Sequence, residues 1–269
     1  MIMRHWMDCP IHTEGRLREW RIFTRRQDGS PNAENGAVCR DITCYGRAVV
    51  IPGVTTEPAV YADQVVGMCV ASGEGQLRLK GDKHALQPGS SFLIPPGQEY
   101  RFKNTGDVEL EFIFARRPPS STDGDFALHH WTEDRPRQEW GTAFQGHWNH
   151  TYRGPACEVH IADLPPHKFS HPHSHSADLD EIWYVHRGPG WHWMGQEYRL
   201  HYPGWALWLD PSELHALMNP SETTVEYIYA TSAALVRDRQ LAQQKEEKLR
   251  ERPAGHPRIL EDRHAFGHS

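Results

Sequence analysis

Short runs of alternating apolar and polar residues recur along the chain, separated by glycine and proline turns. The first set is VVGMCVAS, QLRLKG, SFLIPP and LEFIFA, within residues 65–115. Alternation with many β-branched and aromatic residues is typical of strands that bury one face. Strands this short and evenly spaced predict a small barrel or a double-sheet jelly roll.

The same pattern occurs a second time. Residues 71–115 align without a gap on residues 186–230, an offset of 115 positions. The matched residues are mostly those that fix backbone geometry: Gly73 with Gly188, Pro88–Gly89 with Pro203–Gly204, and Asn104 with Asn219. Glycine, proline and turn asparagine dictate local conformation, so their agreement predicts one fold present twice.

The sequence thus predicts an all-β protein of two tandem jelly-roll barrels, with an N-terminal arm and a C-terminal helix. The expected divisions are residues 1–120 for the arm and first barrel, 121–145 for a linker, 146–232 for the second barrel, and 233–269 for a helix and tail. The linker is rich in Pro, Ser and Asp, whereas residues beyond 233 are good helix formers of mixed charge.

Composition narrows the range of partners. The chain has 269 residues, 38% of them hydrophobic, and a net charge of −6. This mild acidity argues against nucleic acid or an anionic membrane as the main partner. We identify neither a long apolar run nor a secretory signal, and five cysteines without framework spacing indicate reduced thiols, so a cytoplasmic protein is expected.

Candidate metal ligands gather in the segment SHPHSHSADLDEIWYVHRGPG, residues 170–190. In a strand, residues i and i+2 point the same way, so His173 and His175 can meet one ion. Glu181 opens the next apolar run, and His215 arrives from a later strand. Three imidazoles and one carboxylate suit a divalent transition ion and leave coordination positions open for chemistry.

These motifs resemble those of the cupin superfamily. The first cupin motif is matched by His173, His175, Glu181 and Gly188, and the second is matched by Gly204, His215 and Asn219. The resemblance implies two cupin barrels and makes His173, His175, Glu181 and His215 the metal ligands of the second. Five residues separate His175 from Glu181, one more than the usual pattern, so the histidine pair can also be read as His171 and His173.

The first copy lacks this ligand set. Tyr100 stands at the place of His215, and Val66 stands at the place of Glu181. Residues 58–61, around the expected histidines, are Pro, Ala, Val and Tyr. We therefore expect the first barrel to be metal-free.

Aromatic residues accompany the candidate ligands. Of the ten tryptophans in the chain, Trp183, Trp191 and Trp193 follow the histidine segment closely. Indole offers a large apolar surface with one donor, which suits a flat or apolar ligand. The predicted substrate-binding residues are Trp183, Trp191, Trp193 and Leu217, and His171 is assigned to the shell around the ligands.

The leading functional hypothesis is a metal-dependent enzyme. The resemblance to cupin dioxygenases favours an Fe(II) oxidoreductase that acts, with O₂, on a small aromatic or unsaturated molecule, with Glu181 as a catalytic base. Mn(II), Ni(II), Cu(II) or Zn(II) could occupy the same ligands, because ligand type alone does not select among them. The alternatives are a redox-neutral lyase, decarboxylase or isomerase, and a non-catalytic small-molecule-binding protein; a homodimer is expected.

Overall fold

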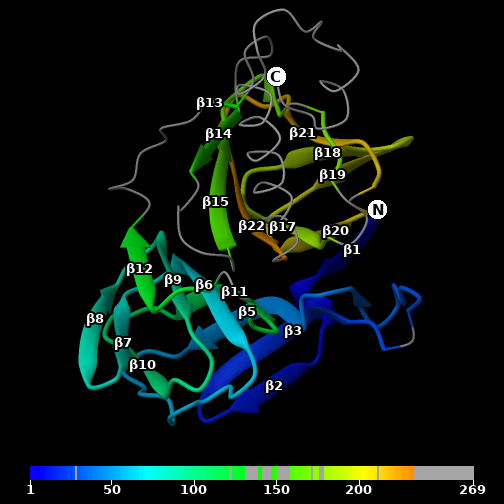
Figure 1. The fold of residues 1–269 in the computed structure, drawn as a ribbon. Helices are drawn as coiled ribbons and strands as arrows, with labels where there is room; N and C mark the ends of the chain where they lie inside the picture. Colours follow the sequence, from blue (N-terminus) through cyan, green and yellow to red (C-terminus); the bar gives the residue numbers. More distant parts are fainter. Residues whose placement is uncertain are drawn as a thin grey trace, which may run out of the picture.

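The computed structural model describes residues 1–27, 29–120, 123–130, 139–140, 147–150, 158–170, 172–175, 179–210 and 212–232. Its architecture is the all-β pair of barrels that the sequence predicts (Figure 1). The helix and tail expected over 233–269, and much of the linker, lie outside the described residues.

The first barrel consists of a large sheet facing a small one. The large sheet has the order β12-β9-β6-β11-β5-β3-β2, with β4 beside β3. Its strands are β2 (Ile11–Glu14), β3 (Leu17–Arg25), β4 (Ala37–Cys39), β5 (Cys44–Val50), β6 (Val65–Ser72), β9 (Ser90–Ile94), β11 (Leu110–Arg117) and β12 (Ala127–His130). The small sheet has the order β10-β7-β8, from β7 (Gly75–Leu79), β8 (Asp82–Leu86) and β10 (Tyr100–Asn104).

The second barrel has the same plan. Its large sheet has the order β1-β20-β17-β22-β15-β14-β13, and its small sheet the order β16-β21-β18-β19. The large sheet contains β1 (Ile2–His5), β13 (Glu139–Trp140), β14 (His147–His150), β15 (Glu158–Leu164), β17 (Glu181–Arg187), β20 (Trp205–Leu209) and β22 (Val225–Thr231). The small sheet contains β16 (Lys168–Phe169), β18 (Gly190–Met194), β19 (Glu197–His201) and β21 (His215–Asn219).

The internal repeat is reproduced strand by strand. β7 and β18, β8 and β19, β9 and β20, and β10 and β21 begin and end at positions 115 residues apart. The asparagines repeat their contacts too. Asn104 Nδ2 donates to the carbonyls of Val50 and Val108, and Asn219 Nδ2 donates to those of Leu164 and Thr223. In each barrel the asparagine thus binds the last residue of one strand (β5 or β15) and the loop before another (β11 or β22), which explains why it recurs.

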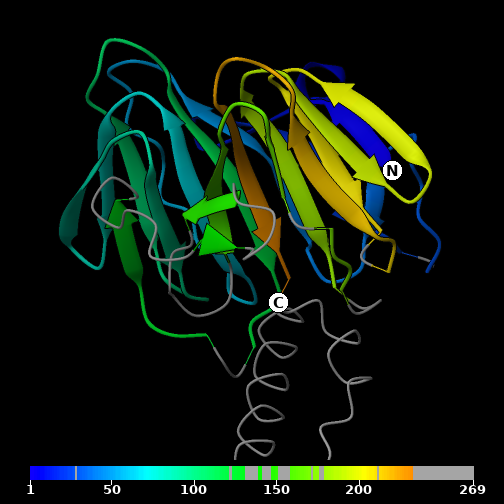
Figure 2. The ribbon, with the colours of Figure 1, turned by 90° about the horizontal axis from the view of Figure 1, so that it is seen from above.

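Three apolar clusters explain how the barrels are joined. One fills the first barrel between its two sheets and includes Phe92, Phe102 and Phe112. Another fills the second barrel and includes Trp183 and Tyr227. The third lies between the two large sheets, which pack against each other through their outer faces (Figure 2). Each large sheet is therefore buried on both sides, which explains why β5 has no exposed residue.

Two segments, the N-terminal arm and residues 121–145, pair differently from the expected division into domains. The arm was assigned to the first barrel with residues 1–120, yet β1 pairs with β20 of the second barrel. Residues 121–145 were expected to be a linker, yet β12 pairs with β9 and β13 pairs with β14. In each case an unpaired sheet edge acquires a strand, which satisfies its backbone hydrogen bonds.

The described cysteines, Cys9, Cys39, Cys44 and Cys69, are free and buried. Burial raises the pKa of the Cys39 and Cys69 thiols, so neither is a reactive thiolate near neutral pH. In the part of the chain that the structure describes, no helix has the length and apolar character needed to cross a bilayer.

Candidate metal centre

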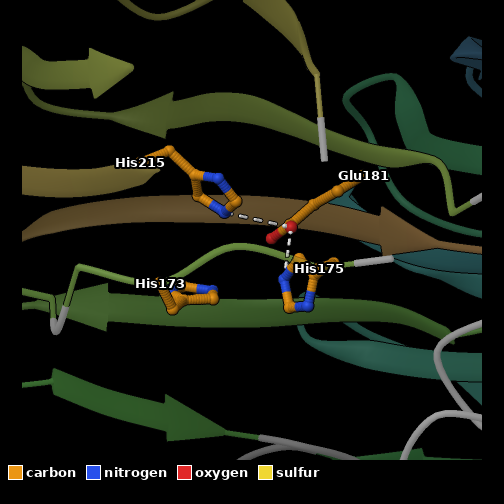
Figure 3. Close-up of side chains that lie close together, drawn as sticks. All are labelled: His173, His175, Glu181 and His215. Carbon is orange, nitrogen blue, oxygen red and sulfur yellow. Dashed lines mark ion pairs between the residues drawn. The ribbon is translucent and has the colours of Figure 1, made fainter. Parts of the chain in front are cut away.

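Four side chains converge inside the second barrel: His173, His175 and Glu181 from one segment, and His215 from a later strand (Figure 3). One donor atom from each lies within 4.8 Å of the others. Glu181 Oε2 is 2.9 Å from His175 Nε2 and 3.3 Å from His215 Nε2. Among the described residues, no other group of three or more His, Cys, Asp or Glu is so placed.

Backbone pairing sets the positions of these residues. His215 begins β21, and an isolated bridge joins it to His173, with N–H···O distances of 3.1 and 2.9 Å. The expected strand through His173 and His175 is reduced to that one bridge. The two rings nevertheless lie near each other, with centroids 4.8 Å apart and planes at 80°. Glu181 is the first residue of β17 and faces inward with Trp183.

Neighbouring groups orient the ligands. Trp183 Nε1 donates to Glu181 Oε1 at 2.8 Å, which leaves Oε2 directed at the histidines. His215 Nδ1 lies 2.9 Å from the carbonyl of Glu213. A carbonyl only accepts, so Nδ1 carries the hydrogen and Nε2 is the nitrogen that can bind an ion.

The electrostatics favour an ionised carboxylate. Burial alone would raise the pKa of the Glu181 carboxyl, but the His175 and His215 imidazoles hold it well below its usual range. Burial in turn lowers the pKa of His215, but Glu181 outweighs this and raises it. A cation therefore competes with a proton for His215 Nε2.

The donor set fits a divalent transition metal. Glu181 Oε2 and His215 Nε2 are buried, and their contacts with each other and with His175 Nε2, at 3.3 and 2.9 Å, lack the geometry of hydrogen bonds. Buried polar atoms so placed are costly unless a ligand completes them. Three imidazole nitrogens and one carboxylate oxygen match the preferences of Fe, Mn, Ni, Cu and Zn.

The first barrel clarifies the histidine register. There the corresponding bridge joins Ala59 to Tyr100, where the second barrel joins His173 to His215. By this equivalence His173 and His175 replace Ala59 and Tyr61. The extra residue of the second barrel then falls between His175 and Glu181. His171 lies outside the described residues, so its role stays a prediction.

The structure places two of the four predicted substrate-binding residues inside the second barrel and two outside it. Trp183 and Leu217 belong to the cluster that fills the second barrel. Trp191 and Trp193 do not, because on β18 it is His192 and the neighbouring Met194 that are buried. Trp193 instead stacks on Tyr198, which is 57% exposed. The two indoles share a face, as the alternation predicts, but that face is the outer one, and their role in substrate binding stays a prediction.

One residue beside the site is not indicated by any motif. Asp180 is fully buried, and its carboxylate accepts the backbone N–H groups of Arg40, Asp41 and Ile42 at 2.7–3.0 Å. Trp208 Nε1 also donates to it, at 3.1 Å. A loop of the first barrel thus holds the residue that precedes Glu181. The signal in the sequence is only an acidic residue beside a candidate ligand.

Comparison with known proteins agrees with this architecture. Residues 47–116 match the cupin domain family. Protein SchB of Streptomyces halstedii is 36% identical over 75 residues, which is 27% of this chain and 53% of SchB. The match therefore spans about half the length of that relative. The family match thus lies in the first barrel, and the likeness to solved structures shows that the second barrel shares the fold.

Solved structures share the arrangement of both barrels. The putative glyoxylate-induced protein of Pseudomonas aeruginosa superimposes with a TM-score of 0.66 at 19% identity, covering 82% of this chain and 83% of that one. Oxalate decarboxylase OxdC of Bacillus subtilis gives 0.65 at 10% identity, covering 87% and 77%. AerE of Microcystis aeruginosa gives 0.60 at 15%, covering 80% and 91%. At these identities the likeness shows the fold.

Proposed function

We propose that this protein is a metal-dependent enzyme whose second barrel holds one divalent ion through His173, His175, Glu181 and His215. The observation that carries the proposal is the convergence of four donor atoms within 4.8 Å, two of them buried without a well-aligned hydrogen bond. A six-coordinate ion bound by four protein atoms keeps about two positions open, which is typical of catalytic rather than structural sites. In this proposal Trp183 and Glu213 fix the orientation of Glu181 and His215.

The reaction that we favour is an Fe(II)-dependent oxidation of a small aromatic or unsaturated molecule by O₂. Iron bound there would supply open positions for the organic ligand and O₂ and would pass electrons from that ligand, which is oxidised, to O₂. The residues of the chain exclude water and offer aromatic surface: Trp183 is buried and stacks on Tyr229, with ring centroids 4.4 Å apart. Glu181 is proposed as the base, in addition to its role as a ligand.

A redox-neutral reaction is the second candidate. The fold is shared with oxalate decarboxylase of Bacillus subtilis, a protein described as having Mn(II) centres. Mn(II) at the same four residues would act as a Lewis acid in a lyase, decarboxylase or isomerase. This candidate keeps the same ligands and differs in the ion and in whether O₂ is consumed.

Metal analysis of the protein purified without added metal tests the centre itself. We expect close to one ion per chain. The variants His175→Ala and His215→Ala should each lose more than about 100-fold in metal affinity, since removing a ligand costs more than removing an outer-shell partner. The control is His167→Ala, which removes an exposed histidine that pairs with Glu222. Equal metal content in all three variants would contradict the proposal.

Oxygen uptake separates the reactions. Iron-loaded protein with a panel of phenols and unsaturated acids should consume O₂ if the leading proposal holds. Product formation by Mn-loaded protein without O₂ uptake would support the redox-neutral reaction instead. Binding without turnover of any substrate would indicate a small-molecule-binding protein.

A further inference from the structure

The small sheet of the second barrel has an apolar outer face. Phe169 of β16 is opposite Met218 of β21. Met218 is opposite Trp191 of β18, and Trp191 is opposite Leu200 of β19. Residues that are opposite each other on paired strands share a face, so these four side chains form one row across the whole sheet. The row is on the outer side, because the next residue of β18, His192, is buried inside.

A second pair of residues widens the row. Trp193 is opposite Tyr198, and their rings stack with centroids 6.2 Å apart and planes at 19°. Tyr202 lies two residues beyond Leu200 and is also on the surface. Tyr198 and Tyr202 are 57% and 56% exposed, and Phe169 and Leu200 are each 37% exposed. Seven residues thus make up what we call the apolar face: Phe169, Trp191, Trp193, Tyr198, Leu200, Tyr202 and Met218.

The first barrel presents the same sheet position with polar residues. Its strands correspond to those of the second barrel, and Thr55 pairs with Lys103 as Phe169 pairs with Met218. In the order used above, the seven counterparts are Thr55, Gln76, Arg78, Lys83, Ala85, Gln87 and Lys103. Three of them are cations, and none is a large apolar residue. The fold therefore does not require an apolar face at this position, so its presence on the second barrel indicates a binding partner.

The apolar face has the size of a binding surface. A large aromatic side chain buries about 150–250 Å² in full, so at these exposed fractions the face leaves roughly 400 Å² of side chain in water. Single exposed apolar residues are ordinary, whereas a contiguous patch of several hundred Å² marks an interaction site. A standard interface buries about 800 Å² per partner, of which about 60% is apolar. The face thus supplies most of the apolar area that one side of a dimer needs.

The chemistry of the apolar face selects a second copy of the chain as its partner. None of its seven residues is charged, and a sheet offers a broad surface rather than a groove, so the matching surface must be apolar and broad too. The same face of another copy meets both conditions. Two apolar sheet faces already pack together in this chain, where the large sheets meet. At the rim, the exposed Glu197 and Arg199 of β19 carry opposite charges, so a copy turned about a two-fold axis can place each beside its opposite.

We propose that this protein forms a homodimer in which the apolar faces of two copies pack against each other about a two-fold axis. The small sheet is on the side of the second barrel away from the first barrel (Figure 2), so a second copy can approach it without meeting the first barrel. The dimer buries Trp191 and Trp193 between the copies. It needs no metal, so it stands or falls apart from the enzymatic function proposed above.

Analytical ultracentrifugation of the full-length chain, without metal or substrate, tests the dimer. The wild-type chain should sediment as a dimer at micromolar concentrations and dissociate on dilution. Trp191→Gln puts the residue type of Gln76 at the centre of the apolar face. It should raise the Kd at least about 30-fold, because buried aromatic residues dominate such interfaces. The matched control is Lys83→Glu, which changes an exposed charge at the position equivalent to Tyr198 and should leave the Kd unchanged.

Tyr198→Lys keeps the test decisive if Trp191→Gln folds poorly. Tyr198 is exposed, so the fold should survive the substitution, and the sedimentation should still shift to that of the monomer. A dimer that both variants leave intact would overturn the proposal, because another surface would then join the copies.

A wild-type chain that stays monomeric would overturn the proposal as well, and dye binding would then show what becomes of the apolar face. Binding of anilinonaphthalene sulfonate that Tyr198→Lys reduces would show an open face, left for a different protein. An absence of dye binding would show that another segment of this chain covers the face.

Discussion

At the residue scale, Trp183 orients a candidate metal ligand in addition to its predicted role as a substrate contact. Predicted as a substrate contact, it also donates to Glu181 Oε1 at 2.8 Å. The variant Trp183→Phe keeps an aromatic ring but loses this donor, so we expect metal affinity to fall about 10- to 100-fold. Competition with a chelator measures the change. Trp193→Phe is the matched control: Trp193 donates to the carbonyl of Gly195 from the outer face, and equal losses in both variants would refute the orienting role.

The residues of the site differ in how far the sequence could predict them. His173, His175, Glu181 and His215 were identified because ligand types at strand spacing carry their own chemistry. The buried contact between His192 and His201 was not predicted, because it joins residues nine positions apart and is completed by Met3, near the start of the chain. Alternation on β18 could show that Trp191 and Trp193 share a face, but not that His192 and Met194 are the buried residues.

At the element scale, the residue before β17, Asp180, is fixed by hydrogen bonds to its carboxylate. The Asp180 carboxylate accepts three backbone N–H groups from residues 40–42. In Asp180→Asn the charge is lost and an amide N–H₂ faces those donors. We expect a loss of about 2–3 kcal/mol in the free energy of unfolding, the worth of a charged hydrogen bond. Urea denaturation measures it, with the exposed Asp82→Asn in β8 as control. An unchanged free energy in Asp180→Asn would show that the contact contributes little.

The repeated strands were the most predictable elements. Turn glycines and prolines fix where strands end, so the offset of 115 residues located β18 to β21 from β7 to β10. The segment before Glu181 was the least predictable. It forms one bridge rather than a strand, and the bridge partner is 42 residues further along the chain. Local alternation cannot report pairing of that kind.

At the scale of the whole molecule, the two barrels are interdependent. Their large sheets share one apolar cluster, and β1 from the arm closes the edge of the second barrel. Nothing in the local pattern of residues 2–5 distinguishes one exposed sheet edge from another, so the sequence assigned this first strand, unlike β2 and β3, to the wrong barrel. The expected homodimer stays a prediction that light scattering can test.

Buried neutral histidines should make the metal-free protein sensitive to acid. Burial lowers the pKa of His186 and His201 to about 4, against about 6.5 in an unfolded chain. Between these values the unfolded state binds more protons, so the free energy of unfolding falls as pH drops from about 6.5 to 4. Each histidine contributes a loss of about 3 kcal/mol over that window. Chemical denaturation at several pH values measures the slope. His186→Gln should make the slope shallower, because its amide does not titrate, and an unchanged slope in this variant would contradict the assignment to His186.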